Sequence, residues 1–163
     1  MTVTTRAATP DDADAICVIH NQGIDDRVAT LDTARRTADG VRKWLAGRGP
    51  RHPVIVGDVD GQLVGWGSLN AFNPRPAYDY VVDFSVYIER GWRGKGAGRQ
   101  LLDRLLQLAR DAGYHKMVLS ALARNDTGLR LYTSAGFSHV GIYREQGLLD
   151  GVWVDVVIME KLL

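Results

Sequence analysis

An alternating strand pattern leads directly into a glycine-rich basic segment and then into a long helix pattern in residues 80–113. Residues 80–88 alternate between an apolar face and a mixed face that carries Asp83, which is typical of a β-strand. Residues 91–102, with the sequence GWRGKGAGRQLL, hold four glycines and three basic residues. Residues 97–113 repeat apolar side chains at helical spacing. A strand followed by a glycine-rich loop and a helix is typical of an α/β protein with an anion-binding loop.

The patterns on either side extend the α/β order over the whole chain. Thr9 and Pro10 predict a helix start, and the turns at 60–61 and 150–151, both Asp-Gly, predict two hairpins. The long helix is expected to bury one stripe, made of Leu101, Leu105, Leu108 and Ala112. The expected elements are strand 3–8, helix 9–24, helix 37–49, hairpin 53–69, strand 80–88, helix 97–113, strand 116–122, helix 125–137 and hairpin 140–162. The order β-α-α-β-β-β-α-β-α-β-β, without linker or repeat, predicts one α/β domain over residues 1–163.

Charge and composition narrow the class of ligand. The net charge is +1, from 20 basic and 19 acidic residues, which argues against a nucleic-acid partner. Basic residues nevertheless gather between Arg90 and Arg110, where Asp103 is the only acidic residue. A local basic patch on a nearly neutral chain indicates a small anionic ligand. Cys17 lies in a helical apolar pattern and is expected in the core, and no spacing of cysteine or histidine predicts a metal site.

No signal-peptide core and no apolar run of membrane-spanning length is present, and we expect a soluble, cytoplasmic protein without a membrane partner.

The glycine segment can present successive backbone N–H groups to a phosphate, with the helix N-terminus adding partial positive charge. Two familiar phosphate motifs fit poorly. A P-loop requires Ser or Thr after its lysine, whereas Gly96 follows Lys95. A dinucleotide fingerprint requires an early βαβ unit, whereas this loop follows four strands. The loop alone leaves open whether it binds an anion or is a turn with solvated arginines.

Two motifs in order resemble those of the Gcn5-related N-acetyltransferases. The segment RGWRGKGAGRQLL resembles their acetyl-CoA signature Arg/Gln-x-x-Gly-x-Gly/Ala, with Arg93, Gly96 and Ala97 at the signature positions. NDTGLRLYTSAGF resembles their second segment, with Asn125 and Tyr132. The resemblance covers essentially the whole chain and implies a mixed central sheet of about seven strands flanked by about four helices. It also implies acetyl-CoA as cosubstrate and no metal.

Within that superfamily, FNPRPAYDYVVDFSVYI and REQGLLDGVWVDVVIM are similar to the phosphinothricin and methionine-sulfone acetyltransferase branch. This finer likeness implies transfer of acetyl to the α-amino group of a small amino acid or analogue, by direct attack in a ternary complex, and a homodimer. Other readings stay open: another amine acceptor, such as a polyamine, an aminoglycoside or a protein N-terminus; a non-catalytic acyl-CoA sensor; or a loop that binds a different nucleotide.

The resemblance also assigns roles to residues. It implies that the main chain of Val86, Tyr87 and Ile88 pairs with the pantetheine arm. It places the pyrophosphate on Gly94 to Arg99, within the cofactor-binding segment 93–99, and further cofactor contact at Asn125. The residues of that segment are Arg93, Gly94, Lys95, Gly96, Ala97, Gly98 and Arg99.

Asp83 is the predicted base, although the branch usually carries Glu there, and the shorter side chain implies either a bridging water or a deeper substrate. Tyr132 is the predicted acid, where the branch often has His. Arg75, Tyr78 and Asp155 are predicted acceptor contacts, with Arg75 suited to a carboxylate. Surface exposure of the arginine and a hairpin-anchoring role for Asp155 are the alternatives. His20 receives no role.

Overall fold

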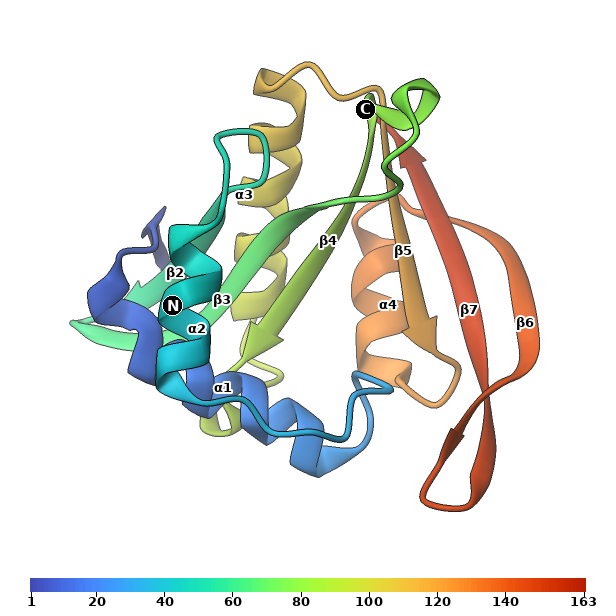
Figure 1. The fold of residues 1–163 in the computed structure, drawn as a ribbon, viewed down its shortest axis with the longest axis horizontal. Helices are drawn as coiled ribbons and strands as arrows, with labels where there is room; N and C mark the ends of the chain where they lie inside the picture. Colours follow the sequence, from blue (N-terminus) through green and yellow to red (C-terminus); the bar gives the residue numbers. More distant parts are fainter.

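A seven-stranded mixed sheet, in the strand order β1-β2-β3-β4-β5-β7-β6, organises the protein (Figure 1). The computed structural model describes residues 1–163. The strands are β1 (Thr4–Ala7), β2 (Val54–Val59), β3 (Gln62–Ala71), β4 (Val81–Ile88), β5 (Lys116–Leu122), β6 (Ser138–Leu149) and β7 (Val152–Leu162). The helices are α1 (Ala13–Asp26), α2 (Ala38–Ala46), α3 (Ala97–Asp111) and α4 (Asp126–Ser134), with short 3-10 turns η1 (Pro10–Asp12), η2 (Pro76–Tyr78) and η3 (Arg90–Trp92). The predicted order of seven strands and four helices is confirmed.

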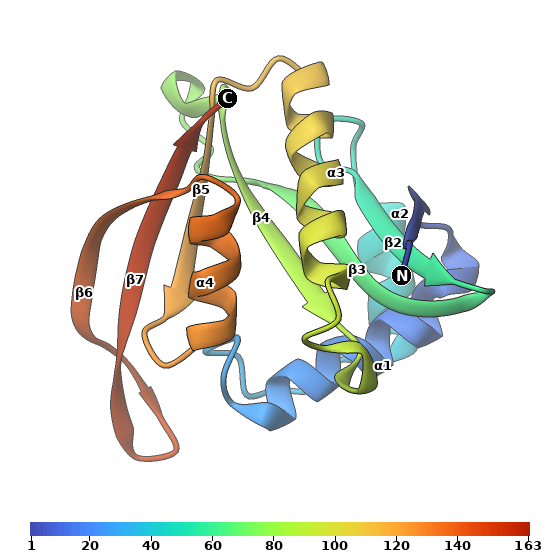
Figure 2. The ribbon, with the colours of Figure 1, turned by 180° about the vertical axis from the view of Figure 1, so that it is seen from behind.

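Two pairs of helices cover opposite faces of the sheet. Figure 1 shows α1 and α2 in front of the sheet, and Figure 2, seen from behind, shows α3 and α4 in front. Buried side chains of α1 and α2 pack against β2 and Trp66 of β3, whereas the leucines of α3 form the larger core with β4 and β5. Because side chains alternate along a strand, Val82 and Phe84 of β4 face α3, while Tyr87 faces α1.

The parallel strands β4 and β5 pair only at their beginnings. The paired residues are Val81 with Lys116, Val82 with Met117 and Asp83 with Val118. Beyond Asp83, β4 stays paired with β3 up to Ile88, and β5 stays paired with β7 up to Leu122. The two strands therefore separate in the middle of the sheet (Figure 2). From this point β4 presents backbone N–H and C=O groups that no neighbouring strand satisfies.

Helix α3 lies close to the sheet because β3 carries glycine where the helix crosses it. A Cβ atom at Gly65 would lie 2.9 Å from a methyl carbon of Leu101 and 2.9 Å from the carbonyl oxygen of Tyr87. A Cβ atom at Gly67 would lie 2.9 Å from a methyl carbon of Leu105. Any larger side chain would push the helix outward. This close approach fixes the start of α3, and with it the glycine segment, against the end of β4.

The predicted turns and helix starts are confirmed in their details. Asp60 and Gly61 both have positive φ, as do Asp150 and Gly151, and each pair joins two antiparallel strands. Asp12 accepts a 2.8 Å hydrogen bond from the backbone N–H of Thr9, which forms part of the predicted cap ahead of α1. No helix of the structure is both long and apolar enough to cross a membrane.

The buried stripe of α3 differs from the prediction at its end. Ala112 is exposed, because the regular helix ends at Asp111 and Ala112 caps it. Leu108 is half-buried. The helix instead buries a wider strip, consisting of Ala97, Leu101, Leu102, Leu105, Leu106 and Ala109. A helix that crosses a twisted sheet at its centre contacts it with more than one ridge of side chains, which a single stripe does not describe.

Candidate functional site

A cavity of about 1140 Å³ opens where β4 and β5 separate. Its walls come from α1 and the segment that follows it, from β3, β4 and β5, from the glycine segment and from α4. Ligand pockets for one small molecule usually measure about 300–1,000 Å³. The cavity is therefore large enough for two reactants, one approaching from the α3–α4 side of the sheet and the other from the α1–α2 side.

The glycine segment forms one end of the cavity and has the backbone shape of an anion site. Gly94 and Gly96 have φ values of +74° and +89°, in the left-handed region that favours glycine. Gly96 is the N-cap of α3, and no side chain accepts from the helix's first N–H groups. Gly94, Gly96 and Gly98 all line the cavity. Free amides at a helix start, preceded by left-handed glycines, form a concave nest suited to phosphate oxygens.

The basic side chains around this nest are mostly engaged elsewhere. Arg93 forms an ion pair with Asp26 of α1 at 2.5 Å, which Arg90 also contacts at 2.8 Å. These arginines hold the pKa of Asp26 below its ordinary value, with the hydrogen bond from Arg90 as the largest cause. Arg99 bonds Asp103 at 2.9 Å and still lines the cavity. The pair of Arg93 with Asp26 ties the loop to α1, and backbone amides are the main donors left for an anion.

Two residues predicted in the cofactor segment lie outside the cavity wall. The ammonium group of Lys95 lies 5.2 Å from the centre of the Trp92 ring. Ala97 is buried in the first turn of α3, where it packs with Val3 and Val64. Its backbone N–H, at the first turn of the helix, is the part of this residue that an anion could use. The remaining predicted cofactor residues, namely Val86, Tyr87, Ile88, Arg93, Gly94, Gly96, Gly98, Arg99 and Asn125, all line the cavity.

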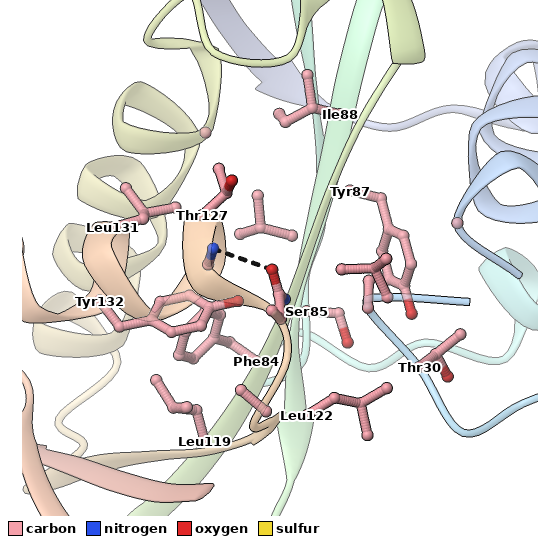
Figure 3. Close-up of a pocket in the computed structure, with 18 of the residues that line it drawn as sticks. Thr30, Phe84, Ser85, Tyr87, Ile88, Leu119, Leu122, Thr127, Leu131 and Tyr132 are labelled. Carbon is pink, nitrogen blue, oxygen red and sulfur yellow. Dashed lines mark hydrogen bonds between the residues drawn. The ribbon is translucent and has the colours of Figure 1, made fainter. Parts of the chain in front are cut away.

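Asn125 lies across the cavity from β4. Its side-chain oxygen accepts a 3.0 Å hydrogen bond from the backbone N–H of Gly128 and caps α4. The cap fixes the position of α4, which carries Tyr132. The Tyr132 ring packs edge-on against Phe84 with ring centres 5.7 Å apart. Figure 3 shows its hydroxyl pointing toward the strand that carries Ser85.

Asp83 and Tyr132 are both half-buried and line the same cavity, and burial changes the acidity of both. Burial raises the pKa of Asp83 to about 6, while a hydrogen bond from the backbone of Phe84 opposes the shift. Burial raises the pKa of Tyr132 to about 12, and the nearby charges of Tyr87 and Asp83 add to the effect. Near neutral pH the carboxylate can therefore take a proton, and the phenol keeps its own.

The three predicted acceptor contacts are not brought to this cavity. Arg75 is exposed and precedes η2. Tyr78 packs edge-on against Phe72, with ring centres 5.4 Å apart. Asp155 accepts a 2.7 Å hydrogen bond from the backbone N–H of Glu145. None of the three lines the cavity, and their role as acceptor contacts stays a prediction that the geometry of this chain does not support.

Several cavity residues were missed by the sequence reasoning. Trp66, Ser68 and Asn70 of β3 stand opposite Tyr87, Ser85 and Asp83 of β4 in the strand register, and all six line the cavity. The alternation of β3 carried this signal, because its polar residues fall at every second position next to the strand of Asp83.

His20, given no role before, is also part of the wall. Its ring is 3% exposed, lies 5.0 Å from the ring of Tyr87, and has no hydrogen-bond partner on either nitrogen. Burial lowers its pKa to about 4, and the positive charge of Arg36 contributes. The imidazole is therefore neutral at pH 7.

Comparison with known proteins agrees with this geometry. Residues 22–137 match the Acetyltransferase (GNAT) family. An L-methionine sulfoximine/L-methionine sulfone acetyltransferase of Salmonella typhimurium is 32% identical over 97% of this chain and 93% of its own length. The L-amino acid N-acyltransferase MnaT of Escherichia coli is 32% identical over 95% of this chain and 91% of its own. The crystal structure of a phosphinothricin acetyltransferase from Sinorhizobium meliloti in complex with AcCoA superposes with a TM-score of 0.93, at 27% identity, over 100% of this chain and 89% of that one.

Proposed function

Because the chain belongs to the acetyltransferase (GNAT) family, we propose that it transfers acetyl from acetyl-CoA to the α-amino group of a small amino acid or amino-acid analogue. One observation carries the proposal: a single cavity joins the glycine nest at the start of α3 to the half-buried carboxylate of Asp83. The relatives named above act on methionine sulfoximine, methionine sulfone and L-amino acids by their names, which supports this class of acceptor.

Acetyl-CoA occupies the α3–α4 side of the cavity in this proposal. The amides of residues 94–99 bind the diphosphate, and the free edge of β4 at Val86, Tyr87 and Ile88 pairs with the pantetheine amides, much as an added strand would. Asn125 contacts the cofactor from the start of α4. This arrangement directs the thioester between Asp83 on β4 and Tyr132 on α4.

The acceptor amine then attacks the thioester carbonyl carbon, and the bond from that carbon to sulfur breaks. Asp83 takes a proton from the amine, directly or through one water. A bridging water would compensate for the side chain of aspartate, which is one methylene shorter than that of glutamate. The phenol of Tyr132 gives its proton to the departing sulfur, which leaves as the free thiol of coenzyme A. Asp83 then releases the amine proton to solvent and Tyr132 takes one back, so that the protons balance. Burial raises the pKa of Tyr132 to about 12, and the phenol therefore holds its proton until the departing sulfur takes it.

The test is release of free thiol from acetyl-CoA with a panel of amines. Phosphinothricin, methionine sulfone, methionine sulfoximine and ordinary amino acids should give turnover, with the N-acetylated product identified by mass. Turnover confined to polyamines, aminoglycosides or peptide N-termini would move the acceptor to another class. Tight acetyl-CoA binding without turnover on any amine would instead support a sensor.

The rate should depend on pH through Asp83. Because burial raises its pKa to about 6, the base is protonated below that pH, and we expect log kcat/KM to rise with pH and to bend near 6. A second bend, set by the acceptor's own amine, should move when the acceptor is changed. A profile of kcat/KM against pH, recorded for two acceptors of different amine pKa, checks this. A single bend that follows the acceptor would remove Asp83 as the base.

The protein is also proposed to form a homodimer through β6 and β7. Several large apolar side chains of this hairpin are exposed: Val140, Ile142, Tyr143, Leu148, Val152 and Trp153. Exposed apolar area gathered on one element is typical of an interaction surface. Sedimentation equilibrium should give twice the chain mass of 18.0 kDa, and a monomer at micromolar concentration would exclude the dimer.

A further inference from the structure

A directed chain of hydrogen bonds lies beside Asp83, on the side of the sheet that faces α1 and α2. The side-chain oxygen of Asn70 accepts from the guanidinium of Arg48 at 3.0 Å and from the hydroxyl of Ser68 at 3.0 Å. The side-chain nitrogen of Asn70 donates to the hydroxyl oxygen of Ser85 at 3.1 Å. Arg48, Asn70 and Ser85 are thus linked in series, and Ser68 joins the series at Asn70.

Arg48 determines which groups in this series donate and which accept. A guanidinium can only donate, and therefore the atom of Asn70 that faces Arg48 must be the oxygen. The amide nitrogen is then turned toward Ser85, whose oxygen can only accept from it. Since Asn70 is the only hydrogen-bond partner of the Ser85 side chain, the hydroxyl proton of Ser85 remains free to donate.

The free proton of Ser85 is available to the cavity. Ser85 lines the cavity and lies two residues after Asp83 on the same face of β4. The positive charge of Arg48, at the other end of this series of hydrogen bonds, is not neutralised by any carboxylate. Arg48 is half-buried and bonds only to neutral oxygens, the carbonyl groups of His52 and Leu69 and the amide of Asn70. A series that begins at an unneutralised cation polarises its last hydroxyl as a donor, which suits an anionic group of a ligand.

We propose that Ser85, polarised through Asn70 by Arg48, binds the α-carboxylate of the acceptor. The inference rests on the proposed function, in which the α-amine lies against Asp83. Side chains two residues apart on a strand are about 6.6–6.8 Å apart along the chain. The amine and the carboxylate of an amino acid are attached to one carbon. With one hydrogen bond at each end, the two groups can reach both side chains at once. The subsite supplies the carboxylate donor that Arg75, outside the cavity, does not.

Arg36 is a cation of the cavity wall that could also take this role. It lines the cavity, but it is exposed, and its guanidinium lies 5.8 Å from the centre of the Trp44 ring. Ser85, in contrast, is fixed by the strand and by Asn70. The experiment below separates the two residues.

The experiment compares methionine sulfone with its decarboxylated amine, 3-(methylsulfonyl)propan-1-amine, as acceptors. A hydrogen bond to a charged group contributes enough that its loss lowers kcat/KM about 10- to 100-fold. We expect Ser85→Ala to show that loss for methionine sulfone and a change of less than about threefold for the amine. Ser85→Thr, which keeps a hydroxyl, should retain most of the activity on methionine sulfone.

Asn70→Asp gives a sharper test, because it preserves shape and leaves Ser85 in place. An aspartate only accepts, and therefore Ser85 would turn its proton toward residue 70 and lose its free donor. Because residue 70 stands opposite Asp83, the new carboxylate also acts on the base and lowers turnover on both acceptors. The quantity compared is therefore the ratio of kcat/KM for methionine sulfone to that for the amine, which we expect to fall as in Ser85→Ala. Ser138→Ala, an exposed serine outside the cavity, is the matched control. Acetyl-CoA affinity and the melting temperature are recorded for each variant to exclude a folding defect.

Different outcomes would overturn the proposed acceptor class and the carboxylate subsite at Ser85. A wild-type enzyme that acetylates amines but no amino acid overturns the proposed acceptor and the subsite with it. A wild type that acetylates methionine sulfone, together with equal losses on both acceptors in Ser85→Ala, overturns the subsite alone. A selective loss in Arg36→Gln with an unaffected Ser85→Ala would assign the carboxylate to Arg36 instead.

Discussion

Replacement of Asp83 by asparagine should lower kcat at least about 100-fold and leave the Kd for acetyl-CoA within about twofold. General-base catalysis contributes about 10²–10⁴-fold, and asparagine has no basic oxygen of comparable strength. The cofactor contacts proposed above involve the glycine segment and the edge of β4 rather than this carboxylate. Steady-state thiol release and calorimetric titration measure the two quantities, with exposed Asp79→Asn as the matched control.

The same substitution should not weaken the fold. Because burial raises the pKa of Asp83 from 3.8 to about 6, the native protein holds this proton more tightly than the unfolded chain does. The free energy of unfolding therefore falls as the pH rises from about 4 to about 6. At pH 7 the carboxyl is ionised in both states, and the full loss of stability is present. Neutral asparagine removes this loss, and the free energy of unfolding of Asp83→Asn should exceed that of the wild type by up to about 3 kcal/mol at pH 7. Loss of turnover through unfolding would appear as a lower melting temperature, opposite to this expectation. Turnover within about tenfold of the wild type would exclude Asp83 as the base.

Replacement of Gly96 by valine should weaken acetyl-CoA binding by about 100-fold. The φ value of +89° at Gly96 is one that a β-branched side chain tolerates poorly. Relaxation of this residue turns the amides at the start of α3 away from the anion. Loss of one or two charge-assisted hydrogen bonds accounts for an effect of this size. Calorimetric titration with acetyl-CoA measures it directly.

Gly61→Val is the matched control for that experiment. Gly61 has φ of +84° in the turn between β2 and β3, and no atom lies within 4 Å of its added Cβ. Both variants therefore carry similar backbone strain, about 1–3 kcal/mol, but only one touches the cavity. If Gly61→Val weakens acetyl-CoA binding as much as Gly96→Val does, the effect comes from general destabilisation and the glycine nest is not the anion site.

The elements around the cofactor segment could be predicted because their signals are local. Alternation in residues 80–88 determined which face of β4 carries Asp83. The left-handed glycines at 94 and 96 were indicated by composition alone, since few other residues adopt that backbone conformation. The two Asp-Gly turns fixed both hairpins in the same way.

What could not be predicted depends on contacts between distant parts of the chain. The separation of β4 from β5 after Asp83 creates the cavity, but it follows from the pairing of each strand with a different outer neighbour. The pairing of Arg93 with Asp26 joins residues 67 positions apart and takes one predicted cation away from the anion.

Acceptor contacts were the least accessible to sequence reasoning. The side-chain chemistry of Arg75 predicts a carboxylate contact, but Arg75 lies outside the cavity wall. Ser68, Asn70 and Ser85 line the cavity on the proposed acceptor side, and strand alternation alone indicates only that they share a face. Their importance depends on the register between β3 and β4 and on the half-buried Arg48, which only the folded chain brings together.

A crystal structure of the complex with acetyl-CoA tests the central claim most directly. We expect the diphosphate within hydrogen-bonding distance of the backbone amides of residues 94–99, and the thioester between Asp83 and Tyr132. A diphosphate bound elsewhere, or a thioester directed away from both side chains, would contradict the account.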